Sequence, residues 1–170
     1  PTAIAGVLGQ NLALTKNGPL ARLLTADSSA SWTSVILWGP AGSGKTTIAR
    51  IIGESGGSHF QELSAVSASV SQVRELIARA KELKNLYDKP TVLFLDEVHR
   101  FSKSQQDSLL GAVESGVITL IAATTENPSF SVITPLISRS IVVTLAPIDD
   151  VAMLEILKSA LSVPEGLPGK

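Results

Sequence analysis

The chain has 170 residues and a formal net charge of −1, with 44% apolar residues, 4% aromatic residues and no cysteine. Its length is that of one ordinary domain, and its apolar content excludes a disordered chain. The lack of cysteine excludes disulfides and cysteine-ligated metal sites, while the balanced charge and few aromatic residues give no sign of a basic or base-stacking surface for nucleic acid.

Apolar runs alternate with helical patterns along most of the chain. In chain order we expect a helix at 11–24, a strand at 35–38, a helix at 45–54, a strand at 59–63, a helix at 70–87, a strand at 91–95, a helix at 103–114, a strand at 117–123, a short helix at 135–138, a strand at 141–145 and a helix at 149–161. Ser69 with Gln72, and Ser102 with Gln105, match the capping box that opens a helix.

This alternation of strands and helices predicts βαβ units. The expected fold class is therefore α/β, with a parallel five-stranded sheet between layers of helices. In such a sheet the ligand site lies at the carboxyl ends of the strands. The motifs that carry chemistry fall at those ends.

A glycine-rich loop follows the first expected strand and precedes a helix. Glycine lets the backbone curl without a Cβ in the way, so that the amides of 42–47 can face an anion at a helix N-terminus. Lys45 is expected to reach the β- and γ-phosphates of a nucleotide, and the Thr46 hydroxyl to bind Mg²⁺. The pattern predicts a phosphate-binding loop of a P-loop NTPase, made of Gly39, Pro40, Ala41, Gly42, Ser43, Gly44, Lys45 and Thr46, with Thr47 next to it.

Two acidic residues follow the strand expected at 91–95, whose continuous apolar run is typical of a central strand. Asp96 is placed to hold Mg²⁺ through water, and Glu97 to orient or deprotonate the attacking water. The pair could instead be solvent-facing acids after an ordinary strand. Beside a phosphate-binding loop, they favour hydrolysis over nucleotide binding alone.

Two further segments allow a functional and an ordinary interpretation. A polar residue at 124–127 could sense the γ-phosphate or hold the attacking water, or it could simply end a strand. Arg139 could act in trans on the nucleotide of a neighbouring subunit, or it could be a surface arginine. His59 and His99 are expected to be structural.

These motifs together resemble the AAA+ ATPases, and within them the clamp-loader-like branch. In particular, the chain is similar to the replication-associated recombination ATPases (RarA or MgsA), whose eukaryotic relatives are the Werner-helicase-interacting proteins. A weaker similarity covers 60–80 and the box at 7–10, in which Leu8 and Gly9 would belong to the adenine pocket. The resemblance is carried by SVILWGPAGSGKTT at 34–47, LDEVHRFSKSQQDSLL at 95–110 and TLIAATTENPSFSVITPLISR at 119–139.

The resemblance implies roles for residues that spacing leaves open. Thr125 becomes the expected sensor residue, with Thr124 and Asn127 as alternatives. Arg139 becomes the expected trans-acting arginine, because it stands where clamp-loader relatives have Ser-Arg-Cys. Here the third residue is Ser140, which leaves the arginine intact.

The resemblance also implies ATP as the substrate, Mg²⁺ as the cofactor and a homo-oligomer with nucleotide at the subunit interfaces. It implies a DNA-stimulated ATPase of the cytoplasm, associated with the nucleoid, that acts in replication-fork maintenance, recombination and DNA repair. The implied partners are forked, gapped or single-stranded DNA ends, single-strand-binding protein and replisome components. No membrane partner is expected, because no apolar run approaches the roughly 20 residues of a transmembrane helix.

The same resemblance divides the chain into a nucleotide-binding core at 1–147 and the beginning of a helical lid at 148–170. The rest of the lid, its sensor arginine and the oligomerisation region would lie outside the chain. Charged residues are 17% of the chain, against about 25% in typical domains, and this fits a surface that other parts normally cover. We therefore expect the isolated fragment to bind nucleotide weakly and to hydrolyse ATP poorly.

Two other functions fit the same motifs. A clamp-loader subunit is disfavoured, because bacterial motor subunits of that complex carry a cysteine-ligated zinc module between the two nucleotide motifs. Here Asp96 follows Lys45 by only 51 residues, without a cysteine. The DNA-branch-migration motors are a further relative, but they lack the run at 100–107. A nucleotide-switched scaffold with little turnover is disfavoured by the intact Glu97 and Arg139, and Glu97→Gln would discriminate it from a motor.

Overall fold

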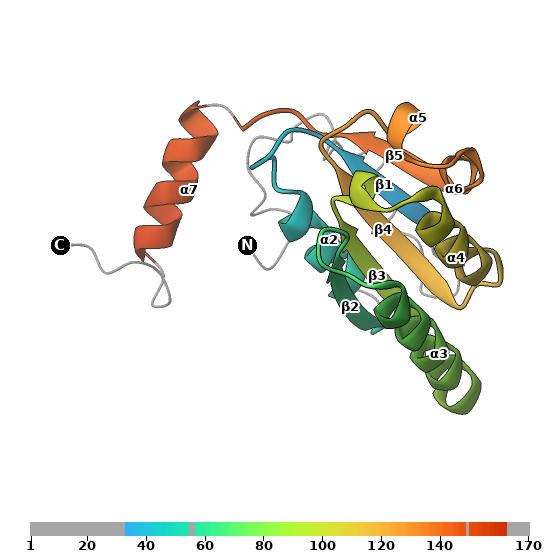
Figure 1. The fold of residues 1–170 in the computed structure, drawn as a ribbon. Helices are drawn as coiled ribbons and strands as arrows, with labels where there is room; N and C mark the ends of the chain where they lie inside the picture. The colour runs from blue at the N-terminus through green and yellow to red at the C-terminus, as the bar shows by residue number, and fades with distance from the viewer. Residues whose placement is uncertain (1–32, 55–56, 149, 163–170) are drawn as a thin grey trace.

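A computed structural model describes residues 33–54, 57–148 and 150–162 (Figure 1). Within them, all the strands pair in parallel in one five-stranded sheet of order β2-β3-β4-β1-β5, so the predicted fold class is confirmed. The helix expected at 11–24, and Leu8 and Gly9, lie outside the described residues. The strands are β1 (Ser34–Trp38), β2 (His59–Ser64), β3 (Thr91–Asp96), β4 (Ile118–Thr124) and β5 (Ser140–Thr144).

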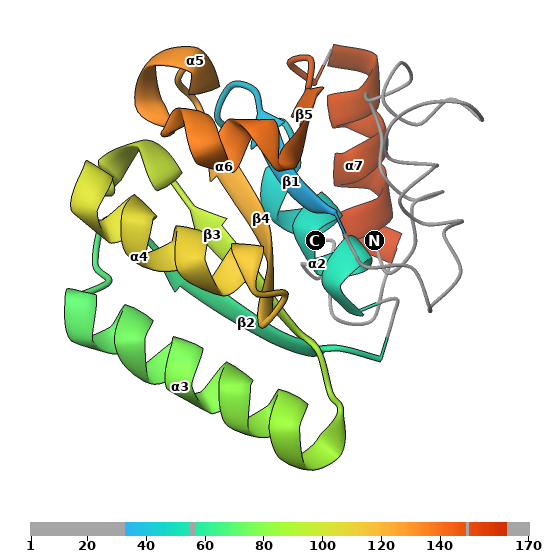
Figure 2. The same cartoon turned by 90° about the vertical axis from the view of Figure 1, so that its right-hand side faces the viewer.

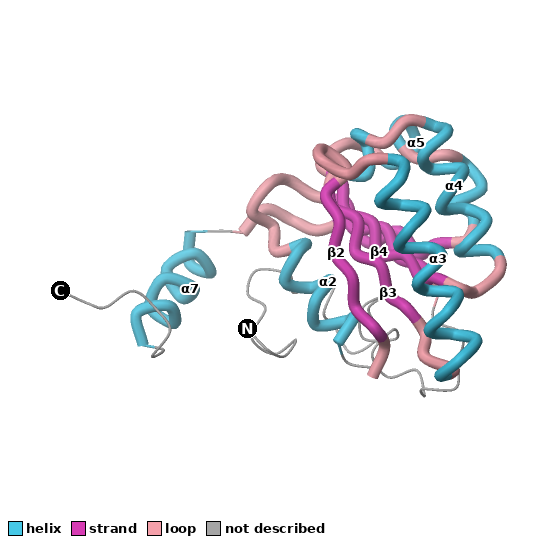
Figure 3. Tube along the Cα trace, turned by 60° about the horizontal axis from the view of Figure 1, so that its bottom comes forward, coloured by secondary structure: helices cyan, strands magenta, loops and turns pink. Residues whose placement is uncertain are grey.

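Helices cover both faces of the sheet (Figures 1 and 3). One face carries α2 (Lys45–Glu54), and the other carries α3 (Val70–Tyr87) and α4 (Lys103–Glu114). Alternate side chains of a strand point to opposite faces. Accordingly, Leu93 and Leu95 of β3 pack with Leu109 of α4, whereas Phe94 packs with Ile48 of α2, and all five side chains are fully buried. This double covering explains the unbroken apolar run of β3.

The long helices begin and end where the sequence signals predict. Both capping boxes are present, with Ser69 and Gln72 at the start of α3 and Ser102 and Gln105 at the start of α4. After α3 the chain turns at Asp88, which has a left-handed φ of 49°. These caps satisfy backbone groups that a helix end leaves without intrahelical partners.

Two short helical elements were not predicted. They are the 3-10 turn η2 (Val98–Arg100) and the single turn α5 (Pro128–Ser131), and both are too short to show a helical period. Local hydrogen bonds fix α5, because the Asn127 side chain accepts from Ser129 N–H at 3.0 Å. The helix expected at 135–138 is α6 (Thr134–Ser138), and the strands begin or end within a residue of their predicted bounds.

One buried amide holds the α5–α6 segment against α4, on the face that Figure 2 turns toward the viewer. Gln106 is 2% exposed, and its Nε2 donates to the carbonyls of Phe101 at 3.2 Å and Ser131 at 2.9 Å. Its Oε1 accepts from Ile133 N–H at 2.9 Å. Gln106 thus fixes the path that runs from the end of β4 to the start of β5.

The last described helix, α7 (Asp150–Ser162), matches the helix expected at 149–161. Figures 1 and 3 show it apart from the sheet, joined to it by the segment after β5. The division into a core and the beginning of a lid stays a prediction.

Candidate nucleotide site

The predicted phosphate-binding loop joins the end of β1 to the start of α2. Gly39 N–H donates to the carbonyl of Thr124 at 3.2 Å, and a Cβ at Gly39 would lie 2.8 Å from the carbonyl oxygen of Leu145, so only glycine fits there. Gly42 and Gly44 have φ of +76° and +87°, a left-handed conformation that glycine adopts without strain. The loop therefore requires the glycines of the motif at the motif's own positions.

The N-terminus of α2 faces this loop. Because α2 begins at Lys45, the amides of its first turn have no partner within the helix, and the helix dipole adds positive potential there. Thr46 and Thr47 are half-buried in that turn. The first helical bond runs from Ile48 N–H to the carbonyl of Gly44 at 3.0 Å. Such an end, with a glycine-rich loop before it, suits a phosphate group.

The Lys45 side chain closes over the loop. Its Nζ donates to the carbonyls of Gly39 at 2.8 Å and Pro40 at 2.7 Å, and lies 3.4 Å from Ser43 Oγ. Burial lowers the pKa of Lys45 from its ordinary value of 10.5, while the carboxylates of Asp96 and Glu97 act in the opposite direction. The lysine thus lies within the electrostatic reach of both acids.

The acid pair lies at the end of β3. Asp96 is the last residue of the strand, and its Oδ1 accepts from Glu97 N–H at 3.0 Å. Glu97 has φ 54° and ψ 46°, a left-handed conformation that is uncommon outside glycine and that often marks functional sites. Both acids are half-buried, whereas Val98 after them is fully buried. This turn keeps both carboxylates at the edge where the phosphate-binding loop lies.

The three polar candidates at the end of β4 differ in what their side chains do. The Thr124 hydroxyl is buried and bonded to His99 and Glu126, and the Asn127 side chain caps α5. Thr125 is exposed at the same edge of the sheet, and no hydrogen bond of its side chain is found within the described residues. The geometry therefore favours Thr125 over its two alternatives as the residue that meets a ligand.

Arg139 lies at the opposite edge of the sheet, the one formed by the amino ends of the strands. The next residue, Ser140, pairs with Ser34 at the start of β1, whereas the phosphate-binding loop follows the end of β1. Four strand steps separate the two positions, a distance of about 13 Å. The guanidinium is turned to Glu114 Oε1 at 2.9 Å and to the carbonyl of Pro135 at 3.1 Å. The fold thus does not bring Arg139 to the loop of its own chain.

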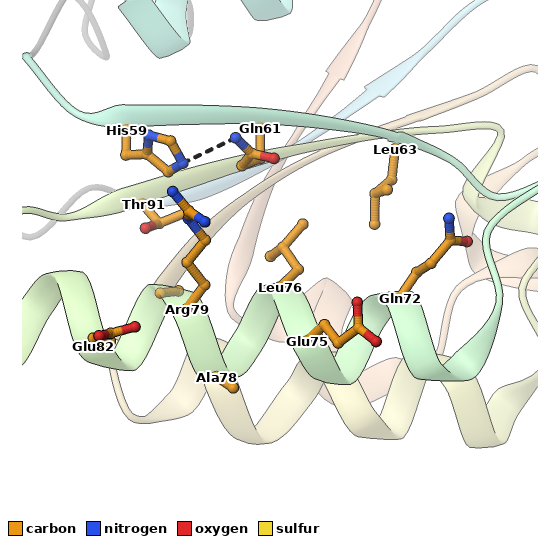
Figure 4. Close-up of a pocket in the computed structure, with 11 residues that line it drawn as sticks. His59, Gln61, Leu63, Gln72, Glu75, Leu76, Ala78, Arg79, Glu82 and Thr91 are labelled. Carbon is orange, nitrogen blue, oxygen red and sulfur yellow. Dashed lines mark hydrogen bonds between the residues drawn. The ribbon is translucent and has the colours of Figure 1, made fainter.

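A separate hollow of about 550 Å³ lies between β2 and α3, and Figure 4 shows the side chains that line it. Gln61 Nε2 donates to His59 Nε2 at 2.9 Å. Burial, and then the cations of Lys89 and Arg79, lower the pKa of His59. Thr91 at its base is 1% exposed, and its hydroxyl finds no hydrogen-bond partner among the described residues. None of the predicted nucleotide-site residues lines this hollow.

The sequence did not show which contacts His99 and Gln106 make. His99 contacts the end of β4, and Gln106 fixes the α5–α6 segment. Their partners lie 25 residues away in the chain, so no spacing pattern in the sequence points to these contacts. Among the described residues, no group of three or more histidine and acidic side chains could hold a metal ion, and no helix could cross a membrane.

Similarity to known proteins shows the family of the chain. Residues 35–147 match the model of the ATPase family associated with various cellular activities (AAA). The chain belongs to the AAA family. Replication-associated recombination protein A of Coxiella burnetii is 44% identical over 170 residues, which are 100% of this chain and 37% of that protein. The resemblance to the replication-associated recombination ATPases, predicted from the sequence, is confirmed.

Two further similarities show how much of each protein the chain covers. An uncharacterized AAA domain-containing protein of Mycobacterium tuberculosis is 48% identical over 98% of this chain and 36% of its own length. The structure of the Thermotoga maritima RuvB Holliday junction branch migration motor is 30% identical, with a TM-score of 0.76 over 95% of this chain and 53% of that chain. The AAA chain described here thus spans just over a third of the curated relatives that it matches.

Proposed function

We propose that this AAA chain is the nucleotide-binding core of a Mg²⁺-dependent, DNA-stimulated ATPase that acts in replication-fork maintenance, recombination and repair. One observation carries the proposal: three elements of an ATPase site meet at one edge of the sheet. They are the phosphate-binding loop with Lys45 after β1, the Asp96–Glu97 pair at the end of β3 and Thr125 after β4. The relatives named for replication-associated recombination supply the biological context.

The loop and Lys45 bind the phosphates. The amides at the start of α2 donate to phosphate oxygens, and Lys45 exchanges a carbonyl of Gly39 or Pro40 for a phosphate oxygen. Because Lys45 Nζ already lies beside the loop, it needs only a small displacement to reach a phosphate oxygen. A buried cation stabilises developing phosphate charge more strongly than a solvated one.

Thr46 and Asp96 are the residues that would hold Mg²⁺. A hydroxyl and one carboxylate suit this ion, which usually takes one or two protein carboxylates together with water and substrate phosphates. The bound ion would neutralise charge on the phosphates during transfer.

Glu97 and Thr125 act on the attacking water. A half-buried carboxylate fixed by a constrained backbone can orient the water and accept its proton. Thr125 can donate to the γ-phosphate, or bond the water in either direction, because it is exposed directly after the strand beside β3. Both roles depend on the placement of the two residues at neighbouring strand ends.

Arg139 acts in trans. It lies at the other edge of its own sheet, so it can stabilise transition-state charge only on a nucleotide bound by a neighbouring copy. A homo-oligomer with nucleotide between subunits follows. Glu114 holds the guanidinium at 2.9 Å in the chain described here, and that partly exposed pair is easily exchanged. The isolated chain is therefore expected to hydrolyse ATP slowly.

Further partners follow from the family resemblance. They are forked, gapped or single-stranded DNA ends, single-strand-binding protein and replisome components, and the expected location is the cytoplasm near the nucleoid. The test is steady-state ATP hydrolysis by the whole protein, with and without forked or gapped DNA, beside Lys45→Ala and Glu97→Gln. Strong stimulation by DNA that both variants lose supports the proposal. Slow turnover that is indifferent to DNA contradicts it.

A further inference from the structure

Thr124 joins three parts of the proposed nucleotide site. Its backbone carbonyl accepts from N–H of Gly39, the first residue of the phosphate-binding loop, at 3.2 Å. Its hydroxyl oxygen lies 3.1 Å from His99 Nδ1, two residues after Glu97. The same hydroxyl accepts from Glu126 N–H at 3.0 Å and lies 3.2 Å from the carbonyl oxygen of Glu126. One buried residue thus contacts the loop, the segment after the acid pair and the exit of β4.

The Thr124 hydroxyl has three hydrogen-bond partners but only one hydrogen, and this decides the direction of its bond with His99. A threonine hydroxyl has one hydrogen to donate and two lone pairs that accept. If the hydrogen goes to the carbonyl of Glu126, the two lone pairs accept from Glu126 N–H and from His99 Nδ1–H. With the opposite tautomer, His99 Nδ1 and the carbonyl of Glu126 would be two acceptors for the one hydroxyl hydrogen. The geometry therefore favours a His99 ring that carries a hydrogen on Nδ1 and donates it to Thr124.

This bond lies where the sheet no longer ties the two strands together. The ladder between β3 and β4 ends at the pair Leu95–Ala122, before the acid pair on one strand and Thr124 on the other. On the core side, η2 is anchored by the buried side chain of Val98. The His99–Thr124 hydrogen bond joins η2 to the end of β4. This hydrogen bond therefore restrains the position of Glu97 relative to Thr125.

We propose that His99 is a positioning residue for ATP hydrolysis. Through its Nδ1–H bond to Thr124, it holds the backbone that carries Glu97 against the strand end that carries Thr125. It does not touch the reacting atoms, and it acts by fixing the two groups that do. The role rests on the function proposed above.

The first test compares three variants of the full-length protein under conditions in which the wild type hydrolyses ATP. His99→Leu removes the donor, whereas His99→Asn keeps an N–H close to the position of Nδ1. His59→Leu is the matched control, because that histidine bonds Gln61 beside the separate hollow. We expect His99→Leu to lower kcat about tenfold with KM for ATP changed less than about twofold, and His99→Asn to restore most of kcat.

The second test needs no turnover. The ¹⁵N shifts of the His99 ring distinguish the two neutral tautomers, and the expected form carries the proton on Nδ1. Thr124→Val removes the acceptor, so this preference should disappear in that variant. A ring protonated on Nε2 in the wild type, or one that ignores Thr124→Val, contradicts the bond on which the proposal depends.

The outcomes separate the two proposals. An active wild type whose kcat is matched by His99→Leu contradicts the role of His99 alone. The role of His99 is also contradicted if His99→Asn does not restore kcat, or if His59→Leu lowers kcat as much as His99→Leu does. A wild type that hydrolyses no ATP with any DNA contradicts the proposed function, and with it the role of His99 in hydrolysis.

Discussion

The edge of the sheet at the carboxyl ends of the strands (the carboxyl edge) and the edge at their amino ends (the amino edge) carry different functional groups. The carboxyl edge brings together the glycine-rich loop, the N-terminus of α2, Lys45 and the acid pair, and it has the two unusual backbone features of the site, left-handed glycines and a left-handed Glu97. The amino edge presents Arg139, bonded to Glu114. In the proposed function, the carboxyl edge binds and activates ATP, and Arg139 completes the site of another copy. The single chain would then hold two halves of two different sites.

Loss of the base at the carboxyl edge should have the largest effect on turnover. Glu97→Gln keeps the size of the side chain and removes its basicity, so we expect kcat to fall about a thousandfold while ATP stays bound. Steady-state hydrolysis together with equilibrium binding of a fluorescent ATP analogue measures both. Near-normal turnover would remove Glu97 from the reaction. Intact recruitment of partners by a variant without turnover would favour a nucleotide-switched scaffold.

Loss of the cation at the same edge should affect binding as well as turnover. Lys45→Ala removes the amine that now lies among the carbonyls of Gly39 and Pro40 and the Ser43 hydroxyl. We expect kcat/KM to fall at least about a hundredfold, with weaker ATP binding, because a buried charge opposite phosphate is lost. Lys84→Ala is the control, since Lys84 bonds the carbonyl of Gly116, near the start of β4. Equal effects of the two variants would contradict the assignment of Lys45.

The segment that joins the two edges should depend on Gln106. Gln106→Leu leaves the carbonyls of Phe101 and Ser131 and the amide of Ile133 without their partner. We expect the free energy of unfolding to fall by about 1–3 kcal/mol. Thermal or urea unfolding measures this, with the exposed neighbour Asp107→Asn as a control. An unchanged stability would mean that the segment is held by its apolar contacts alone.

The smallest expected change is a gain in stability at the amino edge. Thr91, at the start of β3, buries a hydroxyl with no hydrogen-bond partner among the described residues, and such a group costs free energy. Thr91→Val keeps its shape, so we expect the free energy of unfolding to rise by up to about 1 kcal/mol, without effect on ATP hydrolysis. Thr91→Ser, which keeps the hydroxyl, should show no gain. Destabilisation by valine would indicate that the hydroxyl has a partner.

The sequence predicts the carboxyl edge well because its physics is local. A run such as Thr91–Leu95 must be covered on both faces, and the loop glycines, Lys45 and the acids follow strands at fixed spacing. Arg139 shows the limit. Its residue type and spacing suggest a trans role, but only the pairing of Ser140 with Ser34 places it at the far edge. His99 and Gln106 were not assigned to the site, because each acts on a partner 25 or more residues away.

The most direct test of the account mixes two inactive variants of the whole protein. Arg139→Ala keeps the carboxyl edge intact, and Glu97→Gln keeps the arginine, so a mixed oligomer pairs a complete binding edge with a complete arginine edge. Each variant alone should hydrolyse ATP at least about a hundredfold more slowly than the wild type. If Arg139 acts in trans, equal mixing should restore up to about a quarter of the wild-type rate. If the mixture stays as inactive as its components, the division of the site between two copies is contradicted.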